Sequence, residues 1–301
     1  MTDRAGGGRR GVAGDRPPSS HGREPGAHRG RLQDRDRRES RERRPPRPPE
    51  PELPESIEAS QLDREVRQEL RTLSKDNADG VARHLVATAI ALAAEDLQGA
   101  LAHAEAAARR AGRVASVREA LGMVHYRRGE WGKALGEFRT ARRLSGRHHM
   151  LPLMADTERG LGRPERALEL AGTPEARSLP PAERIELAIV VSGARRDLGQ
   201  PDAAVQTLRD IARSTRDDQP WAPRIYYAYA EALTAVADPV GAREWFVRAA
   251  GADQDGATDA GDRLAELDGV DLVDLAEAAD DEEAVEDEEA VEDEERRSAN
   301  E

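Results

Sequence analysis

Apolar side chains recur at intervals of three and four residues through the middle of the chain, which is the spacing of one face of an α-helix. The helical stretches come in pairs, and a short turn joins the two members of each pair. The predicted pairs span residues 79–94 with 96–111, 115–128 with 131–144, 148–161 with 164–171, 181–198 with 201–213, and 222–236 with 239–250. This pattern predicts an all-α fold of about five helix pairs.

Two more helices are expected at the ends of this series. Residues 60–75 carry four apolar side chains on one stripe, with Ser60 as the N-cap. The segment 257–267 is expected to cap the last pair with a polar outer face. The folded body is therefore expected to span residues 56–270.

The turns share one arrangement of small and cyclic residues. An alanine follows each turn at a fixed place, and its copies lie 34, 33, 37 and 38 residues apart: Ala100, Ala134, Ala167, Ala204 and Ala242. Glycine, which tolerates the left-handed backbone at the end of a helix, stands at Gly129, Gly162 and Gly199. Proline, which suits the first turn of a helix, stands at Pro164, Pro201 and Pro239. The sequence therefore contains an internal repeat.

The clearest repeat unit covers residues 115–148. Its small, apolar and aromatic side chains run in the order Leu121, Gly122, His125, Tyr126, Gly129, Trp131, Ala134, Phe138 and Ala141. This order resembles the consensus of the tetratricopeptide repeat (TPR), although Arg118 and Gly146 replace its Trp and its closing Pro. The last unit shows the same order with Tyr226, Tyr229, Ala242, Phe246 and Ala249.

The resemblance covers roughly residues 81–250 and implies a right-handed, TPR-like α-solenoid. Its units lie near 81–114, 115–148, 148–181, 185–218 and 223–250. Such solenoids present a groove lined by the first helix of each unit, so a non-catalytic scaffold for protein–protein interaction is expected. The Arg- and Ala-rich composition is also similar to that of TPR proteins of unassigned role in GC-rich actinobacteria.

Small residues at the repeat positions allow the two helices of a unit to approach closely. Gly122 and Ala134 are expected at this contact. The large side chains expected around it and in the core of the last unit are Leu121, Trp131, Phe138, Trp245 and Phe246.

Both ends of the chain differ from this body in composition. Residues 1–55 contain 14 Arg, 9 Pro and 8 Gly, whereas residues 277–301 contain 14 acids against 2 Arg. Neither end has enough apolar side chains to offset the entropy of ordering it, so both are predicted to be disordered. The head has a net charge of +4 and the tail −12, which leaves −5 of the total −13 for the body. A mildly acidic body argues against nucleic acid as its main ligand.

Each end has a functional and a purely physical interpretation. Arg-rich pieces of the head at 6–11 and 35–44 suggest association with RNA or the ribosome, whereas their interspersed acids favour a solvated polyampholyte. The tail contains Asp-Glu-Glu-Ala-Val-Glu twice, at 281–286 and 287–292. This repeat suggests either an acidic docking peptide or a segment that only keeps the protein soluble.

Patterns typical of enzymes are missing from the sequence. It has no cysteine, no phosphate-binding loop and no Ser/His/Asp or HExxH arrangement. The adjacent His148 and His149 would not share a helix face. No catalytic residue, metal or cofactor is therefore expected. The mostly apolar run 85–94 is too short to span a bilayer and the start lacks an apolar leader, so a cytoplasmic location is expected.

The repeat register places one stripe of each first helix in the groove. The side chains on this stripe are Glu119, Met123, Tyr126, Arg127, Asp156, Arg159, Arg196, Asp197, Arg224, Tyr227 and Glu231. Its four arginines would form a ladder for carboxylates, which predicts an acidic partner segment with the two tyrosines as apolar contacts. The chain's own tail, 280–295, is a candidate competitor. The alternative is that the aspartates and Glu231 pair with these arginines locally and leave a neutral surface.

Overall fold

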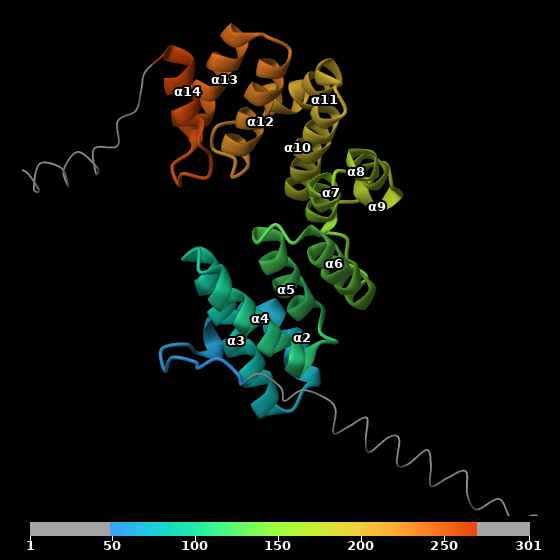
Figure 1. Ribbon diagram of the computed structural model, residues 1–301, viewed down its shortest axis with the longest axis vertical. Helices are drawn as coiled ribbons and strands as arrows, with labels where there is room; N and C mark the ends of the chain where they lie inside the picture. The colour runs from blue at the N-terminus through green and yellow to red at the C-terminus, as the bar shows by residue number, and fades with distance from the viewer. Residues whose placement is uncertain (1–48, 270–301) are drawn as a thin grey trace, which may run out of the picture. The chain divides into compact units, whose positions relative to one another are not determined.

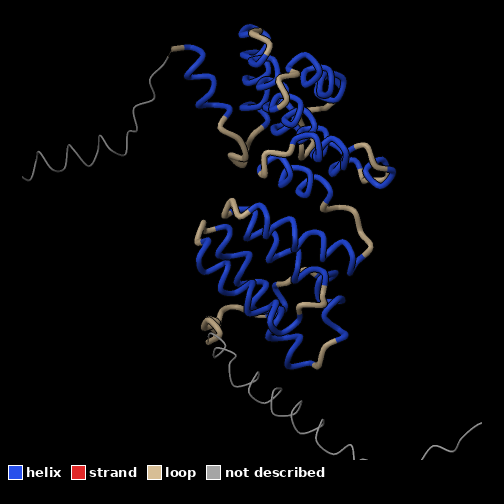
Figure 2. The backbone as a smooth tube through the Cα atoms, turned by 45° about the vertical axis from the view of Figure 1, so that its right-hand side comes forward, coloured by secondary structure: helices blue, strands red, loops and turns tan. Residues whose placement is uncertain are grey.

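Every regular element between residues 49 and 269, the part of the chain that the computed structural model describes, is a helix (Figure 2). Residues 1–48 and 270–301 lie outside the described residues, and they include the whole predicted tail and most of the predicted head. The described residues from Glu50 to Gly269 belong to one compact unit, and the following description concerns them alone.

Five helix pairs follow one another along the chain (Figure 1). They are α3 (Lys75–Ala93) with α4 (Leu97–Ala111), α5 (Ala115–Arg127) with α6 (Trp131–Ser145), α7 (Leu151–Gly160) with α8 (Pro164–Ala171), α10 (Pro181–Asp197) with α11 (Pro201–Ser214), and α12 (Ala222–Ala235) with α13 (Pro239–Ala252). The helices of each pair pack together, each pair packs on the next, and α14 (Ala260–Asp268) packs on α13. The predicted all-α, TPR-like pairing is therefore confirmed within the described residues.

The turns inside the pairs have one backbone geometry. Two residues past the end of the first helix in each of the three middle pairs, the φ angle is positive: +68° at Gly129, +71° at Gly162 and +69° at Gly199. The same position in the first and last pairs is held by Glu95 and Ala237, both at +57°. A left-handed backbone is strained for residues with a side chain, so these two turns carry more backbone strain than the three glycine turns.

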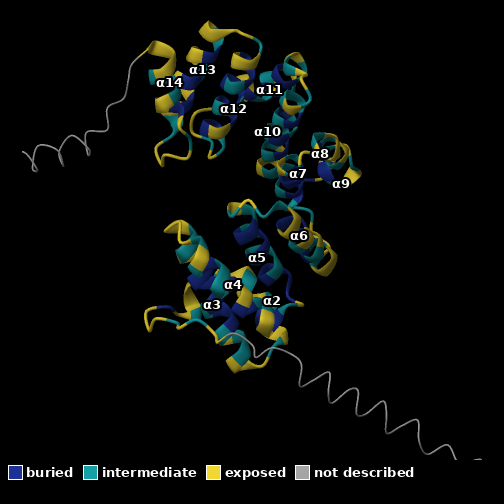
Figure 3. Ribbon diagram, in the orientation of Figure 1, coloured by how far each residue is buried: buried dark blue, intermediate teal, exposed yellow. Residues whose placement is uncertain are grey.

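The close helix contact of the second pair is formed as predicted. Phe138 and Ala134 are fully buried on α6, and Gly122 of α5 faces the Phe138 ring. Along the helices, buried residues alternate with intermediate and exposed ones (Figure 3). A Cβ atom added to Gly122 would lie 2.6 Å from Cε1 of Phe138, so only glycine fits without a shift of the ring. The corresponding repeat residues Ala167, Ala204, Ala242 and Phe246 are also fully buried.

Two of the expected core aromatics, Trp131 and Trp245, are half-buried and pack at the edge of the core. Trp131 begins α6 and lies with its ring against Gly160 of α7. Trp245 meets Tyr229 edge-on, with ring centroids 5.0 Å apart, and lies under the guanidinium of Arg248. Each ring covers the rim of a contact between helices, and one side of it stays accessible.

The helix predicted over 60–75 is instead broken into three short pieces. They are η1 (Ala59–Gln61), α2 (Arg64–Glu69) and η2 (Leu70–Thr72). Asp63, and not Ser60, caps α2, because its carboxylate accepts a hydrogen bond from the Glu65 N–H at 2.7 Å. A further short helix, α9 (Pro174–Arg177), follows the third pair and was not predicted.

The segment from Glu50 to Ile57 lies against α3 and α4, although the predicted boundary of the body stood at residue 56. The Glu50 carboxylate accepts two hydrogen bonds from Arg110, at 2.9 and 2.6 Å. Arg83 donates to the carbonyl oxygens of Ile57 at 2.7 Å and Pro54 at 3.2 Å. The body therefore begins about six residues earlier than the composition indicated.

Candidate functional site

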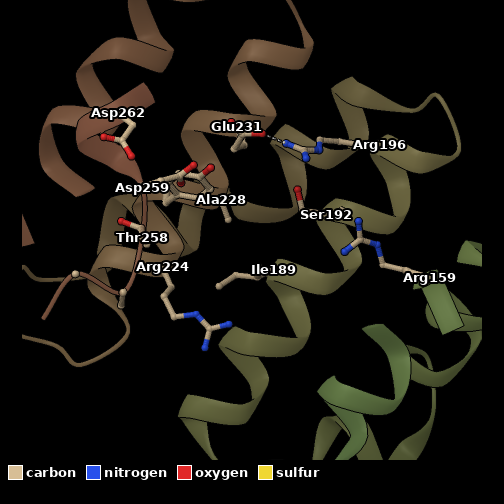
Figure 4. A pocket seen from close by; sticks show the side chains of 14 residues that line it. Arg159, Ile189, Ser192, Arg196, Arg224, Ala228, Glu231, Thr258, Asp259 and Asp262 are labelled. Atoms are coloured by element: carbon tan, nitrogen blue, oxygen red, sulfur yellow. Dashed lines mark hydrogen bonds and ion pairs between the residues drawn. The ribbon is translucent and has the colours of Figure 1, made fainter. Parts of the chain in front are cut away.

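A pocket of about 690 Å³ opens over the first helices of the last two pairs (Figure 4). We call it the α10–α12 pocket. Its lining residues from α10 are Ile189, Ser192, Gly193 and Arg196, and those from α12 are Arg224, Tyr227, Ala228 and Glu231. Intervals of three, one and three residues put each set on a single helix face. Arg159 of α7, the loop residues 256–259 and Asp262 complete the lining.

Five of the eleven predicted groove residues meet in this pocket: Arg159, Arg196, Arg224, Tyr227 and Glu231. Asp156 and Asp197 instead lie with Arg159 in a neighbouring hollow beside Trp131. Glu119 lines a separate pocket beside α2. The structure therefore brings stripe residues of the later units together at this pocket, and Tyr126 of α5 contacts their neighbour Asp156.

Three predicted groove residues of α5, Met123, Tyr126 and Arg127, do not line the α10–α12 pocket. The Tyr126 hydroxyl donates a hydrogen bond to Asp156, and burial together with this bond raises the pKa of Tyr126. Arg127 is exposed and lies 3.6 Å from the Glu95 carboxylate. Met123 is half-buried. Tyr126 and Arg127 therefore interact with neighbouring acids of the chain itself.

Arg159 is held firmly by two acids of the stripe. Its Nε lies 2.8 Å from Oδ2 of Asp197, and its Nη1 lies 2.8 Å from Oδ1 of Asp156. The guanidinium also lies flat against Gly193, where any Cβ atom would overlap it. Most of its hydrogen-bonding capacity is used within the protein, so Arg159 shapes the pocket wall.

Arg196 and Arg224 each use less of their capacity. Nη1 of Arg196 donates to Glu231 at 2.9 Å, and Glu231 also accepts from Arg263 at 3.2 Å. Nη2 of Arg224 lies 2.7 Å from Glu186, and the Arg224 side chain is 53% exposed. A guanidinium has five N–H donors, so both arginines retain donors toward the pocket.

Arg159 pairs with Asp156 and Asp197, and Arg196 pairs with Glu231. For these two arginines, the alternative that stripe acids pair with them locally is therefore confirmed. Among the lining residues, three arginines face three carboxylates, those of Glu231, Asp259 and Asp262, so the formal charge of the pocket is zero. A ladder of unpaired arginines is therefore not what the structure contains.

One wall of the pocket comes from a loop after the last repeat. The Asp253 carboxylate accepts hydrogen bonds from the backbone N–H groups of Ala257 and Thr258, both at 2.7 Å, which fixes the turn. Burial and a hydrogen bond to Asp259 raise the pKa of Tyr227. This wall lies outside the repeat, so the repeat pattern does not predict it; its only signal in the sequence is the turn-forming run from Asp253 to Gly256.

Between residues 49 and 269, no group of three or more His, Asp or Glu side chains could hold a metal ion. In the same region, no helix is long and apolar enough to cross a membrane.

Comparison with known proteins gives matches among solved structures. No family model matches the chain, and no curated protein matches it. The pilF protein of Pseudomonas aeruginosa is 19% identical, with 64% of this chain and 86% of that chain covered and a TM-score of 0.46. YrrB, a TPR protein with an unusual peptide-binding site, is 16% identical, with 58% and 87% covered and a TM-score of 0.38.

The helix pairs, the left-handed turns and the small buried residues at the repeat positions are those expected for tetratricopeptide units. By these features of its own structure, the chain is a TPR-like helical-repeat protein.

Proposed function

We propose that this protein is a non-catalytic scaffold that binds a segment of a partner protein in the α10–α12 pocket. One observation carries the proposal: side chains from three successive first helices, α7, α10 and α12, converge on one pocket. Stacked repeats generally bind partners through such a continuous surface.

The lining suits a polypeptide that is partly apolar and partly acidic. Ile189, Ala228 and the Tyr227 ring offer apolar surface, and that ring and Phe246 meet in a T-shaped contact with centroids 5.4 Å apart. Arg196 and Arg224 have donors left for a carboxylate of the ligand. Because Glu231 and Glu186 compete for these arginines, an acidic ligand should bind weakly and lose affinity as salt screens the charges.

The proposal is tested by fluorescence anisotropy with a labelled peptide of residues 280–295. The binding protein is the chain ended after Ala276, because every described helix lies before that residue and the competing tail is removed. At low ionic strength we expect binding that fades as salt is added and is lost in Arg196→Ala/Arg224→Ala.

The matched control removes the same charge from arginines elsewhere. Arg166 and Arg243 are each exposed and paired with one acid, Glu169 and Asp268. Arg166→Ala/Arg243→Ala should bind the peptide as the parent does. Equal loss in both double variants would show a non-specific charge effect, and unchanged binding in Arg196→Ala/Arg224→Ala would reject the site. Thermal melts of each variant confirm that it remains folded.

A further inference from the structure

A second pocket, of about 660 Å³, lies between α2, the start of α5, the loop before α7 and the start of α10. We call it the α2–α10 pocket, and it shares no lining residue with the α10–α12 pocket. Its charged lining consists of Asp63, Glu65, Glu69, Glu119 and Glu183 against Arg147, together with His148 and His149. Five carboxylates facing one arginine make this a strongly acidic cavity.

Part of this charge has a structural role. The Asp63 carboxylate caps α2, and Oε2 of Glu69 accepts a hydrogen bond from the Ser116 N–H at 3.1 Å, at the beginning of α5. Carboxylates are favoured at helix N-termini because the backbone N–H groups there lack intrahelical partners. Capping alone therefore accounts for two of the five acids.

The half-buried acids of the pocket have weak cationic partners. Oε1 of Glu69 lies 3.3 Å from Arg147, whose side chain is 54% exposed. Oε1 of Glu119 lies 3.3 Å from Nε2 of His149. An ionised carboxylate has about four acceptor sites, so Glu69 and Glu119 can each accept further hydrogen bonds from a ligand.

A buried hydroxyl in the wall of the pocket gives independent evidence for a ligand. Ser116 is 8% exposed, and its Oγ has no hydrogen-bond partner among the described residues. A buried polar atom left without a partner costs about 1–3 kcal/mol, so such atoms commonly mark a place that another group fills. A donor entering between Glu69 and Glu119 would offer Ser116 its missing hydrogen bond.

We propose that the α2–α10 pocket binds an arginine side chain of a basic segment in a partner protein. A guanidinium is planar and has five donors, which matches two carboxylates and a hydroxyl better than the point charge of an ammonium group. This site is distinct from the proposed acidic-segment site, and it would let one scaffold hold two segments of opposite charge.

The test uses the full chain and a fluorescein-labelled peptide Gly-Arg-Gly-Arg-Gly. Two matched peptides carry lysine or citrulline in place of arginine, and citrulline keeps the shape of the side chain without its charge. We expect the arginine peptide to bind, the lysine peptide to bind several-fold more weakly and the citrulline peptide not to bind. Equal binding of the citrulline peptide would overturn the proposal.

Variants locate the site. Glu69→Gln/Glu119→Gln should weaken binding of the arginine peptide at least tenfold, whereas the exposed pair Glu105→Gln/Glu244→Gln should leave it unchanged. Ser116→Ala removes the unpartnered hydroxyl, so it should weaken binding several-fold without lowering the thermal midpoint. Unchanged binding in both Glu69→Gln/Glu119→Gln and Ser116→Ala would show that the peptide binds elsewhere and would overturn the proposal. Retained binding in Arg196→Ala/Arg224→Ala is expected, because the two pockets share no residue.

Discussion

Replacing Gly122 with alanine should destabilise the protein through one identifiable contact. The new Cβ would lie 2.6 Å from Cε1 and 2.7 Å from Cδ1 of Phe138, and 3.3 Å from Cβ of Glu137. The Phe138 ring is fully buried, so it has no free space into which to retreat. The two helices of the second pair must therefore move apart, or the ring must leave its preferred rotamer.

The magnitude follows from two opposing terms. Overpacking a well-filled core costs about 1–3 kcal/mol, whereas alanine is favoured over glycine inside a helix by about 1 kcal/mol. Gly136 is an exposed glycine of α6, and no atom lies within 4 Å of a Cβ added there. Gly136→Ala therefore gains the helix propensity of alanine without any cost of overpacking. The free energies of unfolding of Gly122→Ala and Gly136→Ala should therefore differ by about 1–3 kcal/mol.

Urea unfolding followed by circular dichroism measures this difference. Gly136→Ala should unfold at a higher urea concentration than the parent, and Gly122→Ala should unfold below Gly136→Ala with an unchanged slope. Gly122→Leu and Ala134→Leu should lose more, because the same contact receives a larger side chain. Equal stability of Gly122→Ala and Gly136→Ala would refute the close helix contact and with it the repeat register.

Three further predictions concern the turns, a buried histidine and the start of the body. Ala237→Gly should raise the free energy of unfolding by roughly 0.5–1 kcal/mol in urea titrations, because it relieves a left-handed φ, and Gly129→Ala should lower it by about 1 kcal/mol. Burial lowers the pKa of His84 to about 4, so the unfolded chain binds the extra proton between about pH 4 and its ordinary 6.5. Stability should therefore fall as pH drops through that window, and a pH series of urea midpoints should show a shallower fall in His84→Gln. A chain of residues 49–276 should melt with the parent, whereas one starting at residue 56 should be less stable by about 1 kcal/mol because it lacks Glu50 and its bonds to Arg110.

Much of the helix pairing could be predicted because its signals are local. One helix ends just before Gly162, which adopts a left-handed backbone, and the next begins at Pro164, which fits the first turn, so both signals act within a few residues. The helix predicted over 60–75 is wrong because a local signal there outweighs the apolar pattern. A regular apolar stripe suggested one helix, whereas the Asp63 side chain starts a new one in the middle of it.

The candidate sites were less predictable because they depend on contacts between distant residues. Spacing placed Arg196 and Arg224 on the correct helix faces, but their free donors depend on Glu231 and Glu186 from neighbouring helices. The α2–α10 pocket was missed because its lining comes from segments up to 120 residues apart, from Asp63 to Glu183. No periodicity links such segments, so only the packed structure reveals that they share a cavity.

Photo-crosslinking tests the central claim, that a partner segment occupies the α10–α12 pocket, most directly. The probe is the 280–295 peptide with p-benzoylphenylalanine in place of Val285, added to the chain ended after Ala276. Mass spectrometry of the digested product should place the cross-link on α7, α10, α12, α14 or the loop 253–259, which together line the pocket, and Arg196→Ala/Arg224→Ala should abolish it. Cross-links that map outside these elements, or that persist in the double variant, would contradict the account.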